Sequence, residues 1–443
     1  MIVIKSLENS LSRNNTEAAA NSVSSFLIFI FLLSYIPPGN ISIGTLVLGF
    51  PRLFLVLAFV PALVIFLSNS KIRKSSVDYL VFAHSVWLVL SILMNHGTSQ
   101  IEFAGLQLVE TFGAYILGRT LLYSLAAYRY FWRTFATFSL IILPIALIEL
   151  FTERFILHEL FAPFINIFDN ATARYPRRWG FDRVQGNFEH PILFGIFWSF
   201  GCAHYLSVFK TSAAKLFFIL IAGCLVAMSL SSGAYLALLF QVMLFTWGYL
   251  SGGRWRLLLL IAAFALLVTE IASDRSALVA ISTRLAFSAQ TAYWRVHIFD
   301  FGIQNVFDNP LFGLGLNDWV RPHWLTSSVD NQWLLIAMRN GIPAIFLLVS
   351  AIALMFLKLI RREDFSDEQK EYRVNFLISF TCLILALGTV AVWSGTQAFF
   401  WVILAMGVNL ATLETQNNNK EELEPKGVFK SDDITEPKYS RFS

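Results

Sequence analysis

The chain has 443 residues, of which 56% are hydrophobic and only 14% are charged. Soluble domains are about one half apolar and about one quarter charged, so this composition excludes an ordinary soluble domain and indicates a polytopic membrane protein. The net charge of +4 points to no particular partner. The three cysteines lie in apolar runs and form no disulfide framework, and the sequence has no Walker loop and no nucleic-acid-binding motif.

Apolar runs of about 20 residues, the length that crosses a bilayer, predict twelve transmembrane helices. The predicted spans are about 23–37, 43–68, 78–94, 102–124, 134–151, 189–209, 214–230, 233–250, 257–271, 331–358, 374–394 and 397–413. We therefore expect an all-α polytopic fold in which residues 23–413 form a transmembrane helical domain. Residues 1–22 are expected to form an N-terminal tail, and the polar residues 414–443 a disordered C-terminal tail.

The positions of lysine and arginine orient this predicted bundle. With a cytoplasmic N-terminus, the basic loops at 71–74, 129–133 and 358–373 are also cytoplasmic, as the positive-inside rule requires. Both termini are then cytoplasmic. Two large loops, at about 152–188 and 272–330, are expected on the opposite side of the membrane.

These two outer loops contain arginine but no lysine, on the side where basic residues are normally rare. The arginines are Arg154, Arg174, Arg177, Arg178, Arg183, Arg275, Arg284, Arg295 and Arg321. Anchoring of the loops to lipid phosphates explains some of them. The exclusive use of arginine favours planar, bidentate contacts with phosphate or carboxylate groups, and a diphosphate at the outer face fits this pattern.

Three segments, in order along the chain, resemble the O-antigen ligase and Wzy-type polysaccharide polymerase superfamily. They are RVQGNFEHPILFG from Arg183, the run from Arg295 to PLFGLG at 310–315, and DNQWLLIAMRNG from Asp330. The resemblance covers about residues 180–410. Its departures favour an exopolysaccharide polymerase-like branch: Asp330 replaces the histidine of ligases, Ser232 replaces the arginine of a Ser-Arg-Gly pattern, and Arg339 replaces an acidic residue.

The resemblance implies a GT-C-like membrane glycosyltransferase at the periplasmic face of a bacterial inner membrane. Such an enzyme polymerises or ligates repeat units from an undecaprenyl-diphosphate-linked oligosaccharide onto a sugar hydroxyl, in exopolysaccharide or O-antigen biosynthesis. The resemblance implies no cofactor and no bound metal, and it admits polysaccharide export or chain-length proteins as partners. Polymerase or ligase activity, the sugars and the acceptor all stay open.

The same resemblance suggests catalytic residues. We expect Arg295 and Arg183 to bind the diphosphate, with a lipid-headgroup anchor as the alternative for each. Asp330 is the first candidate for the general base, and a plain helix N-cap is its alternative. Glu189 and His190 compete for the role of base, and a structural role is at least as plausible for the histidine.

A second set of residues is expected to contact the substrate: Arg284, Arg321, Trp319, Trp324, Asn331 and Trp333. For the tryptophans, the default alternative is the membrane interface. Glu110, within the fourth span, is expected to pair with an arginine such as Arg52 or Arg119. Pro310, Gly313 and Gly315 are expected to turn the outer loop back over the helix ends.

A twelve-span secondary transporter, or a polysaccharide or lipid exporter, is the alternative function. Transporters concentrate polar residues and broken helices at mid-membrane and often show repeat symmetry. Here the polar residues lie in two unequal outer loops, and no repeat is visible. A scaffold protein would leave the outer arginines unexplained.

Overall fold

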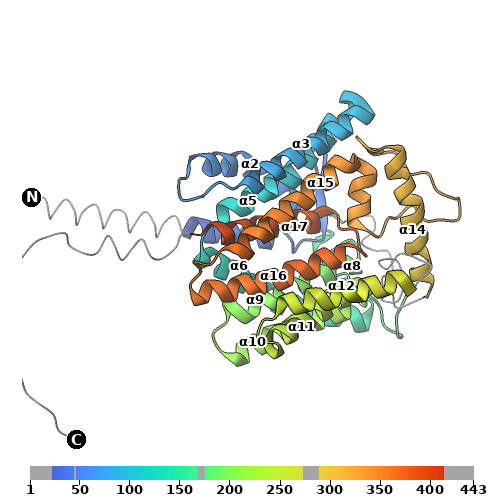
Figure 1. The fold of residues 1–443 in the computed structure, drawn as a ribbon. Helices are drawn as coiled ribbons and strands as arrows, with labels where there is room; N and C mark the ends of the chain where they lie inside the picture. Colours follow the sequence, from blue (N-terminus) through green and yellow to red (C-terminus); the bar gives the residue numbers. More distant parts are fainter. Residues whose placement is uncertain (1–21, 44–45, 168–174, 273–288, 414–443) are drawn as a thin grey trace, which may run out of the picture.

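The computed structural model describes residues 22–43, 46–167, 175–272 and 289–413, which form a bundle of α-helices with one small sheet (Figure 1). Apart from Ser22, the predicted tails at 1–22 and 414–443 lie outside these residues, and so do Arg174, Arg275 and Arg284. The expectations for the tails and for Arg284 therefore stay predictions.

The first half of the chain contains a helix at Ser22–Leu33 and the following elements. They are β1 (Gly39–Ile43), β2 (Leu46–Gly49), α2 (Phe50–Ser68), α3 (Ser76–His96), η1 (Gly97–Gln100), α4 (Ile101–Leu108), the π-helical turn η2 (Val109–Gly113), α5 (Ala114–Leu121), α6 (Leu125–Thr152), α7 (Ile156–Phe161) and β3 (Asn166–Ile167).

The second half is entirely helical in its regular structure, within the described residues. Its elements are α8 (Pro191–Ser199), α9 (Gly201–Val208), α10 (Ser212–Met228), α11 (Ser232–Leu250), α12 (Trp255–Ala272), α14 (Ala289–Asp308), α15 (Gln332–Arg361), α16 (Asp367–Leu387) and α17 (Ser394–Thr412).

Eight helical runs in the described chain are long and apolar enough to cross a membrane, by length and composition. One of them, Ser76–Leu121, is broken at Gly97, where φ is +65°, and α4 packs back on α3. The apolar helices Ser22–Leu33 and Ser212–Met228 are shorter. The chain is thus a mostly helical, multi-pass membrane protein, as predicted. The total of twelve crossings and the GT-C-like arrangement stay predictions.

Two of the predicted spans are displaced. The span predicted at 43–68 starts too early, because α2 begins at Phe50 and the preceding residues form an antiparallel hairpin of β1 and β2. β-branched residues favour strands there, and Pro51 fits the first turn of a helix, where its missing N–H costs nothing. The span predicted at 374–394 ends too late, because α16 stops at Leu387 and residues 388–393 connect it to α17.

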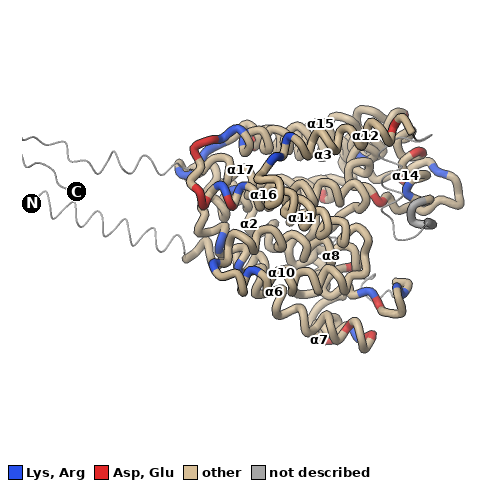
Figure 2. The backbone as a smooth tube through the Cα atoms, turned by 60° about the horizontal axis from the view of Figure 1, so that its bottom comes forward, with Lys and Arg blue, Asp and Glu red and all other residues tan. Residues whose placement is uncertain are grey.

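The two ends of the bundle differ in chemistry (Figure 2). We call one the basic end: it holds the α2–α3 and α15–α16 connections, where Lys358 donates to Ser75 Oγ at 2.9 Å. We call the other the loop end: it holds the sheet, residues 153–167 and 175–190, α14 and residues 309–331 (Figure 1). The positive-inside rule predicts that the loop end is periplasmic.

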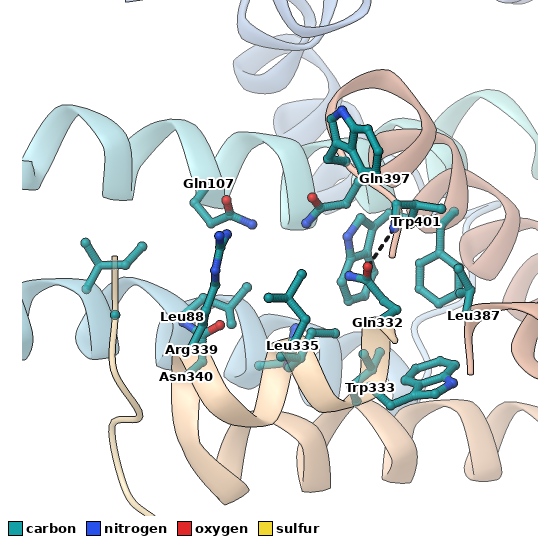
Figure 3. Close-up of a pocket in the computed structure, with 18 of the residues that line it drawn as sticks. Leu88, Gln107, Gln332, Trp333, Leu335, Arg339, Asn340, Leu387, Gln397 and Trp401 are labelled. Atoms are coloured by element: carbon teal, nitrogen blue, oxygen red, sulfur yellow. Dashed lines mark hydrogen bonds between the residues drawn. The ribbon is translucent and has the colours of Figure 1, made fainter. Parts of the chain in front are cut away.

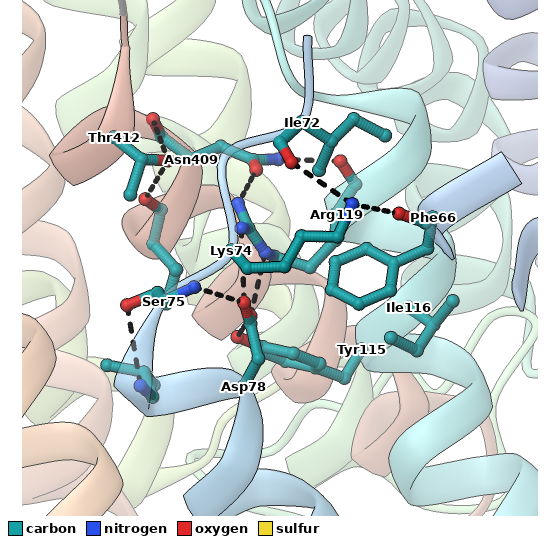
Figure 4. Close-up of polar contacts among 12 residues, drawn as sticks. Phe66, Ile72, Lys74, Ser75, Asp78, Tyr115, Ile116, Arg119, Asn409 and Thr412 are labelled. Carbon is teal, nitrogen blue, oxygen red and sulfur yellow. Dashed lines mark hydrogen bonds and ion pairs between the residues drawn. The ribbon is translucent and has the colours of Figure 1, made fainter. Parts of the chain in front are cut away.

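A buried polar network joins α3, α5 and α17 at the basic end (Figure 4). The Arg119 guanidinium donates to Asp78 Oδ1 at 2.9 Å, to the Asn409 side chain, and to the Arg73 carbonyl at 2.5 Å. Tyr115 also donates to Asp78, at 2.5 Å. This network provides Arg119, which is fully buried, with both a counter-charge and hydrogen-bond acceptors.

Protein cover varies strongly between helices. The runs Pro191–Val208 and Gly395–Thr412 are largely buried inside the bundle, whereas no part of Trp255–Ala272 is buried. An apolar helix without protein cover suits a lipid environment, where its backbone groups are satisfied internally. α8, α9 and α17 therefore form the interior against which the loop end is built.

Candidate functional site at the loop end

Three arginines, Arg178, Arg183 and Arg295, form what we call the arginine cluster. The first two lie in the segment between α6 and α8, and the third lies on α14. Each donates to a backbone carbonyl: Arg178 Nη1 to Leu230 (2.6 Å), Arg183 Nε to Ser229 (3.4 Å) and Arg295 Nη2 to Thr389 (3.2 Å). These carbonyls follow the C-termini of α10 and α16, where helix carbonyls lack intrahelical partners and the helix dipole attracts cations.

These contacts leave several guanidinium nitrogens unused. Arg183 Nη2, Arg295 Nε and Arg295 Nη1 are buried and have no hydrogen-bond partner. Within the described chain, no carboxylate forms an ion pair with any member of the cluster. An unpaired buried donor on a charged group costs more than the roughly 1–3 kcal/mol typical of a neutral one. A fold that keeps three such donors is suited to an anionic ligand that accepts from them.

The pKa values show that the cluster is electrostatically coupled. Burial, followed by the charge of Arg178, lowers the pKa of Arg183 to about 10. Burial also lowers the pKa of Arg295, and the positive charge of Arg178 lowers it further. The negative charge of Asp330 has the opposite effect. All three guanidinium groups stay charged at neutral pH, so the cluster concentrates positive charge that suits a phosphate or diphosphate.

The remaining described arginines of the outer loops are paired differently. Arg154 pairs with Glu159, Arg177 with Asp182 and Glu153, and Arg321 with Asp318. Arg154 and Arg177 are exposed, and surface pairs of this kind contribute little to stability. The arginine excess therefore divides into surface pairs and the three members of the cluster.

A buried carboxylate fixes the backbone of the loop that carries Arg183. Glu149, near the end of α6, accepts the backbone N–H of Gln185 at 2.8 Å and that of Gly186 at 3.2 Å. Gly186 has a φ of +56°, and a Cβ there would lie 2.7 Å from the Phe194 ring, so glycine is required for both reasons. Arg183 is thus presented by a fixed backbone.

Asp330 precedes α15 but does not cap it. The cap is Asn331, whose side-chain oxygen accepts the Leu334 N–H at 3.1 Å, so the N-cap alternative for Asp330 is wrong. Asp330 Oδ1 accepts from Ser328 Oγ at 3.0 Å. Its charge opposes the lowering of the Arg295 pKa, so the first candidate base and the first candidate diphosphate ligand interact electrostatically without forming an ion pair. Asn331, expected to bind substrate, uses its oxygen as the cap instead.

His190 and Glu189 have different surroundings. His190 caps α8, because its Nδ1 accepts the Ile192 N–H at 2.9 Å. Burial, then the charges of Arg183 and Arg178, lower the pKa of His190 to about 3, so the imidazole is neutral. With Nδ1 accepting, the proton sits on Nε2 and no lone pair remains for a base. This contact favours the structural role. Glu189 Oε2 accepts from Trp393 Nε1 at 2.7 Å.

The expected substrate-binding residues are dispersed over the loop end. Trp319 is buried and donates to the Ser327 carbonyl at 3.0 Å, with the Arg321 guanidinium over its ring, so both hold the 318–328 loop together. Trp333 donates to the Ile384 carbonyl at 3.2 Å. Trp324 is 43% exposed and packs against His297 of α14. Of these side chains, Trp324 is the most available to a sugar ring.

Helix α15 is sharply kinked at Gly341, where φ is +80°. The Ile342 N–H donates to the carbonyl of Pro310 at 2.8 Å, and the next residue is a proline without an N–H. The carbonyls of Met338 and Arg339 therefore lose the partners that a continuous helix would give them.

The loop before α15 returns to satisfy these carbonyls. The Leu314 N–H donates to Met338 and the Gly315 N–H to Arg339, each at 2.8 Å. Gly313 and Gly315 both have a φ of +62°, a conformation that favours glycine. The predicted turn at these glycines is confirmed, and it fixes the first part of α15. The expected pairing of Glu110 is also observed, with Arg52 at 2.6 Å.

Sequence reasoning missed some parts of this site. Arg178 was one of the outer arginines, but only its contact with Leu230 distinguishes it from its neighbour Arg177. The Thr389 carbonyl and Trp393 were hidden within a predicted span. The glycine, threonine and tryptophan at 388–393 interrupt the apolar run, and this interruption could have indicated that the helix ends before them.

Comparison with known proteins identifies one part of the chain. Residues 217–349 match the family model for O-antigen ligase, which confirms the predicted resemblance to the O-antigen ligase and Wzy-type superfamily. The matched part includes Arg295, Asp330 and the kink of α15, whereas Arg178 and Arg183 precede it. No curated protein matches the chain.

Proposed function

We propose, on the premise that residues 217–349 form an O-antigen ligase domain, that the protein is a glycosyltransferase acting at the periplasmic face of the bacterial inner membrane. It transfers an oligosaccharide from an undecaprenyl-diphosphate donor to a sugar hydroxyl, and so polymerises or ligates repeat units. The observation that carries the proposal is the set of buried, unpartnered nitrogens on Arg183 and Arg295. They come from separate segments and suit one diphosphate.

The chemistry assigns a role to each side of the site. The acceptor oxygen attacks the anomeric carbon, the bond from that carbon to the diphosphate oxygen breaks, and the electron pair leaves with the diphosphate. Arg183 and Arg295 stabilise the leaving charge in a site that is ordered before the reaction. The proton of the acceptor hydroxyl passes to Asp330, with Glu189 as the competing base.

The transfer uses no metal in this proposal.

Transfer in proteoliposomes tests the proposal. The purified protein is given a lipid-diphosphate-linked oligosaccharide, and product length is measured for Arg183→Lys, Arg295→Lys and the control Arg154→Lys. Loss of donors preorganised for a leaving group costs about 100- to 1,000-fold in rate, and lysine cannot reproduce bidentate contacts. We expect that loss for the two cluster variants and none for the control. Wild-type rates in Arg295→Lys would exclude the diphosphate role.

The alternative of a transporter predicts a different result. Transporters bind substrate near mid-membrane, whereas the arginine cluster lies at the loop end, against the ends of α10 and α16. A reporter fused after Asn317 should be periplasmic, and one fused after Arg362 cytoplasmic. A cytoplasmic signal at Asn317 would remove the basis for a periplasmic transferase.

A further inference from the structure

A second polar site lies next to the arginine cluster. It is a cavity of about 110 Å³ between α3, α4, α15 and α17 (Figure 3). Its polar lining consists of Gln107, Gln332, Arg339, Asn340 and Gln397, and the other lining residues are mostly apolar or aromatic. Four amides and a guanidinium thus line one small cavity of an otherwise apolar bundle, and Arg339 is the exposed member of this set.

Arg339 has no counter-charge among the described residues. Within the described residues its guanidinium forms no ion pair and no hydrogen bond, and Figure 3 shows it pointing across the cavity toward Gln107. The arginines Arg52 and Arg119, by contrast, pair with Glu110 and Asp78. A charged side chain on a membrane helix normally faces a partner or a substrate path.

The backbone around Arg339 is fully engaged, although its side chain is not. Its carbonyl accepts from the Gly315 N–H at 2.8 Å and from Ser91 Oγ at 3.2 Å. The neighbouring Asn340 carbonyl accepts from Trp87 Nε1 at 3.0 Å. The kink of α15 is therefore held by both α3 and the returning loop, and this fixes the direction of the Arg339 side chain.

Two of the residues that line the cavity relate it to the candidate active site. Trp393 lines it and also donates to Glu189, and Gln332 lies two residues after Asp330. A larger cavity of about 410 Å³ shares Arg339 and Trp393 and is bounded by Ser328 at the loop end. Arg339 thus lines both cavities, at a distance of roughly 10 Å along the helix from Gln332.

We propose that Arg339, with Gln107 and Gln397, binds the diphosphate of a second lipid-linked saccharide, the acceptor, while the arginine cluster binds the donor diphosphate. This inference rests on the proposed function and makes it specific, because it selects polymerisation over ligation. The acceptor keeps its own diphosphate throughout the transfer. Only the donor's bond between the anomeric carbon and its diphosphate breaks, and the acceptor hydroxyl loses its proton to the base.

The test compares two acceptors in proteoliposomes, at saturating donor. One acceptor saccharide carries a polyprenyl diphosphate, and the other carries an uncharged lipid of the same length. For Arg339→Gln we expect KM for the diphosphate acceptor to rise about 10-fold or more, the scale of a lost charged hydrogen bond. With the uncharged acceptor, wild type and Arg339→Gln should have the same KM. For the diphosphate acceptor, the KM of Arg339→Lys should lie between those of the wild type and Arg339→Gln. This variant keeps the charge and serves as the control for folding.

The outcomes separate this inference from the proposed function. No transfer to either acceptor by the wild type would contradict the proposed function itself. Transfer by the wild type, with an equal KM for the diphosphate acceptor in Arg339→Gln, would overturn only the second site. An equal loss with both acceptors would also overturn it, because Arg339 would then serve the donor or the fold. A KM effect that appears only in anionic vesicles would assign Arg339 to bulk phospholipid and reject the proposal.

Discussion

The buried guanidinium groups at the two ends of the bundle differ in their partners: Arg119 at the basic end is fully paired, whereas the arginine cluster at the loop end is not. Arg119 is fully buried, and its guanidinium contacts Asp78, the Asn409 side chain and the Arg73 carbonyl (Figure 4). Arg183 and Arg295 each contact one backbone carbonyl and leave buried nitrogens without partners. The first arrangement is complete within the chain. The second is complete only with an added anion.

The difference distinguishes arginines that stabilise the fold from arginines that await a ligand. Removal of a saturated buried charge leaves its partner uncompensated, at a cost of several kcal/mol. Removal of an unsaturated one also removes the penalty of its unpaired donors, so stability changes little. Stability and activity should therefore respond oppositely at the two ends of the bundle.

The largest expected effect is on stability, at the basic end. Arg119→Ala leaves the buried carboxylate of Asp78 without its counter-charge, which should lower the free energy of unfolding by about 3–5 kcal/mol and sharply reduce protein abundance in the membrane. Thermal unfolding in detergent measures this. The control is Arg129→Ala at the same end, whose exposed pair with Glu368 should contribute less than about 1 kcal/mol. Equal losses in the two variants would remove the distinction.

The next effect is on turnover, at the loop end. Because Asn331 is the helix cap, Asp330→Asn changes the charge without removing the cap. Activity should fall about 100-fold, the scale of general base catalysis, with unchanged thermal stability. Asp330→His should retain more activity than Asp330→Asn, because imidazole accepts a proton near neutral pH.

Glu189→Gln is the matched control for the base. Oligosaccharide transfer by each variant is compared at equal protein level. A near-normal Asp330→Asn together with an inactive Glu189→Gln would move the base to Glu189, next to Trp393.

A smaller effect concerns pH and His190. Its pKa is lowered from 6.5 to about 3 in the folded chain, so below pH 6.5 the unfolded chain binds a proton that the folded chain does not. The free energy of unfolding should therefore decrease as the pH is lowered, by about 2 kcal/mol from pH 6.5 to pH 5. His190→Asn keeps an N-cap and should reduce this dependence. A steep loss of transfer in His190→Asn at pH 7.5 would instead restore the histidine as a catalytic candidate.

The elements that depend on local sequence were predictable. Apolar length located the helices, and the turn at Gly313 and Gly315 followed from the glycines and Pro310 in a polar loop. The pairing of Glu110 followed from the cost of an isolated charge in an apolar helix. Each of these conclusions needs only a few neighbouring residues.

The parts that depend on distant contacts were not predictable. Which outer arginine joins the cluster is decided by carbonyls at Ser229, Leu230 and Thr389, far from the arginines in sequence. The cap of α15 fell on Asn331 rather than Asp330 because the helix begins one residue later than expected. Arg339 appeared only as a departure from a family pattern, and its cavity requires α3, α4 and α17 together.

The binding of a short-chain polyprenyl diphosphate to the purified protein tests the central claim most directly. Calorimetric titration compares the Arg339→Gln variant, which keeps Arg295, with the double variant that also carries Arg295→Lys. The Arg339→Gln substitution is present in both proteins so that only binding at the arginine cluster is measured. We predict a Kd about 10-fold or more weaker in Arg295→Lys, with a thermal midpoint that is unchanged or slightly higher. An equal Kd, or a loss of stability as large as that of Arg119→Ala, would show that the loop-end arginines hold the fold rather than a diphosphate.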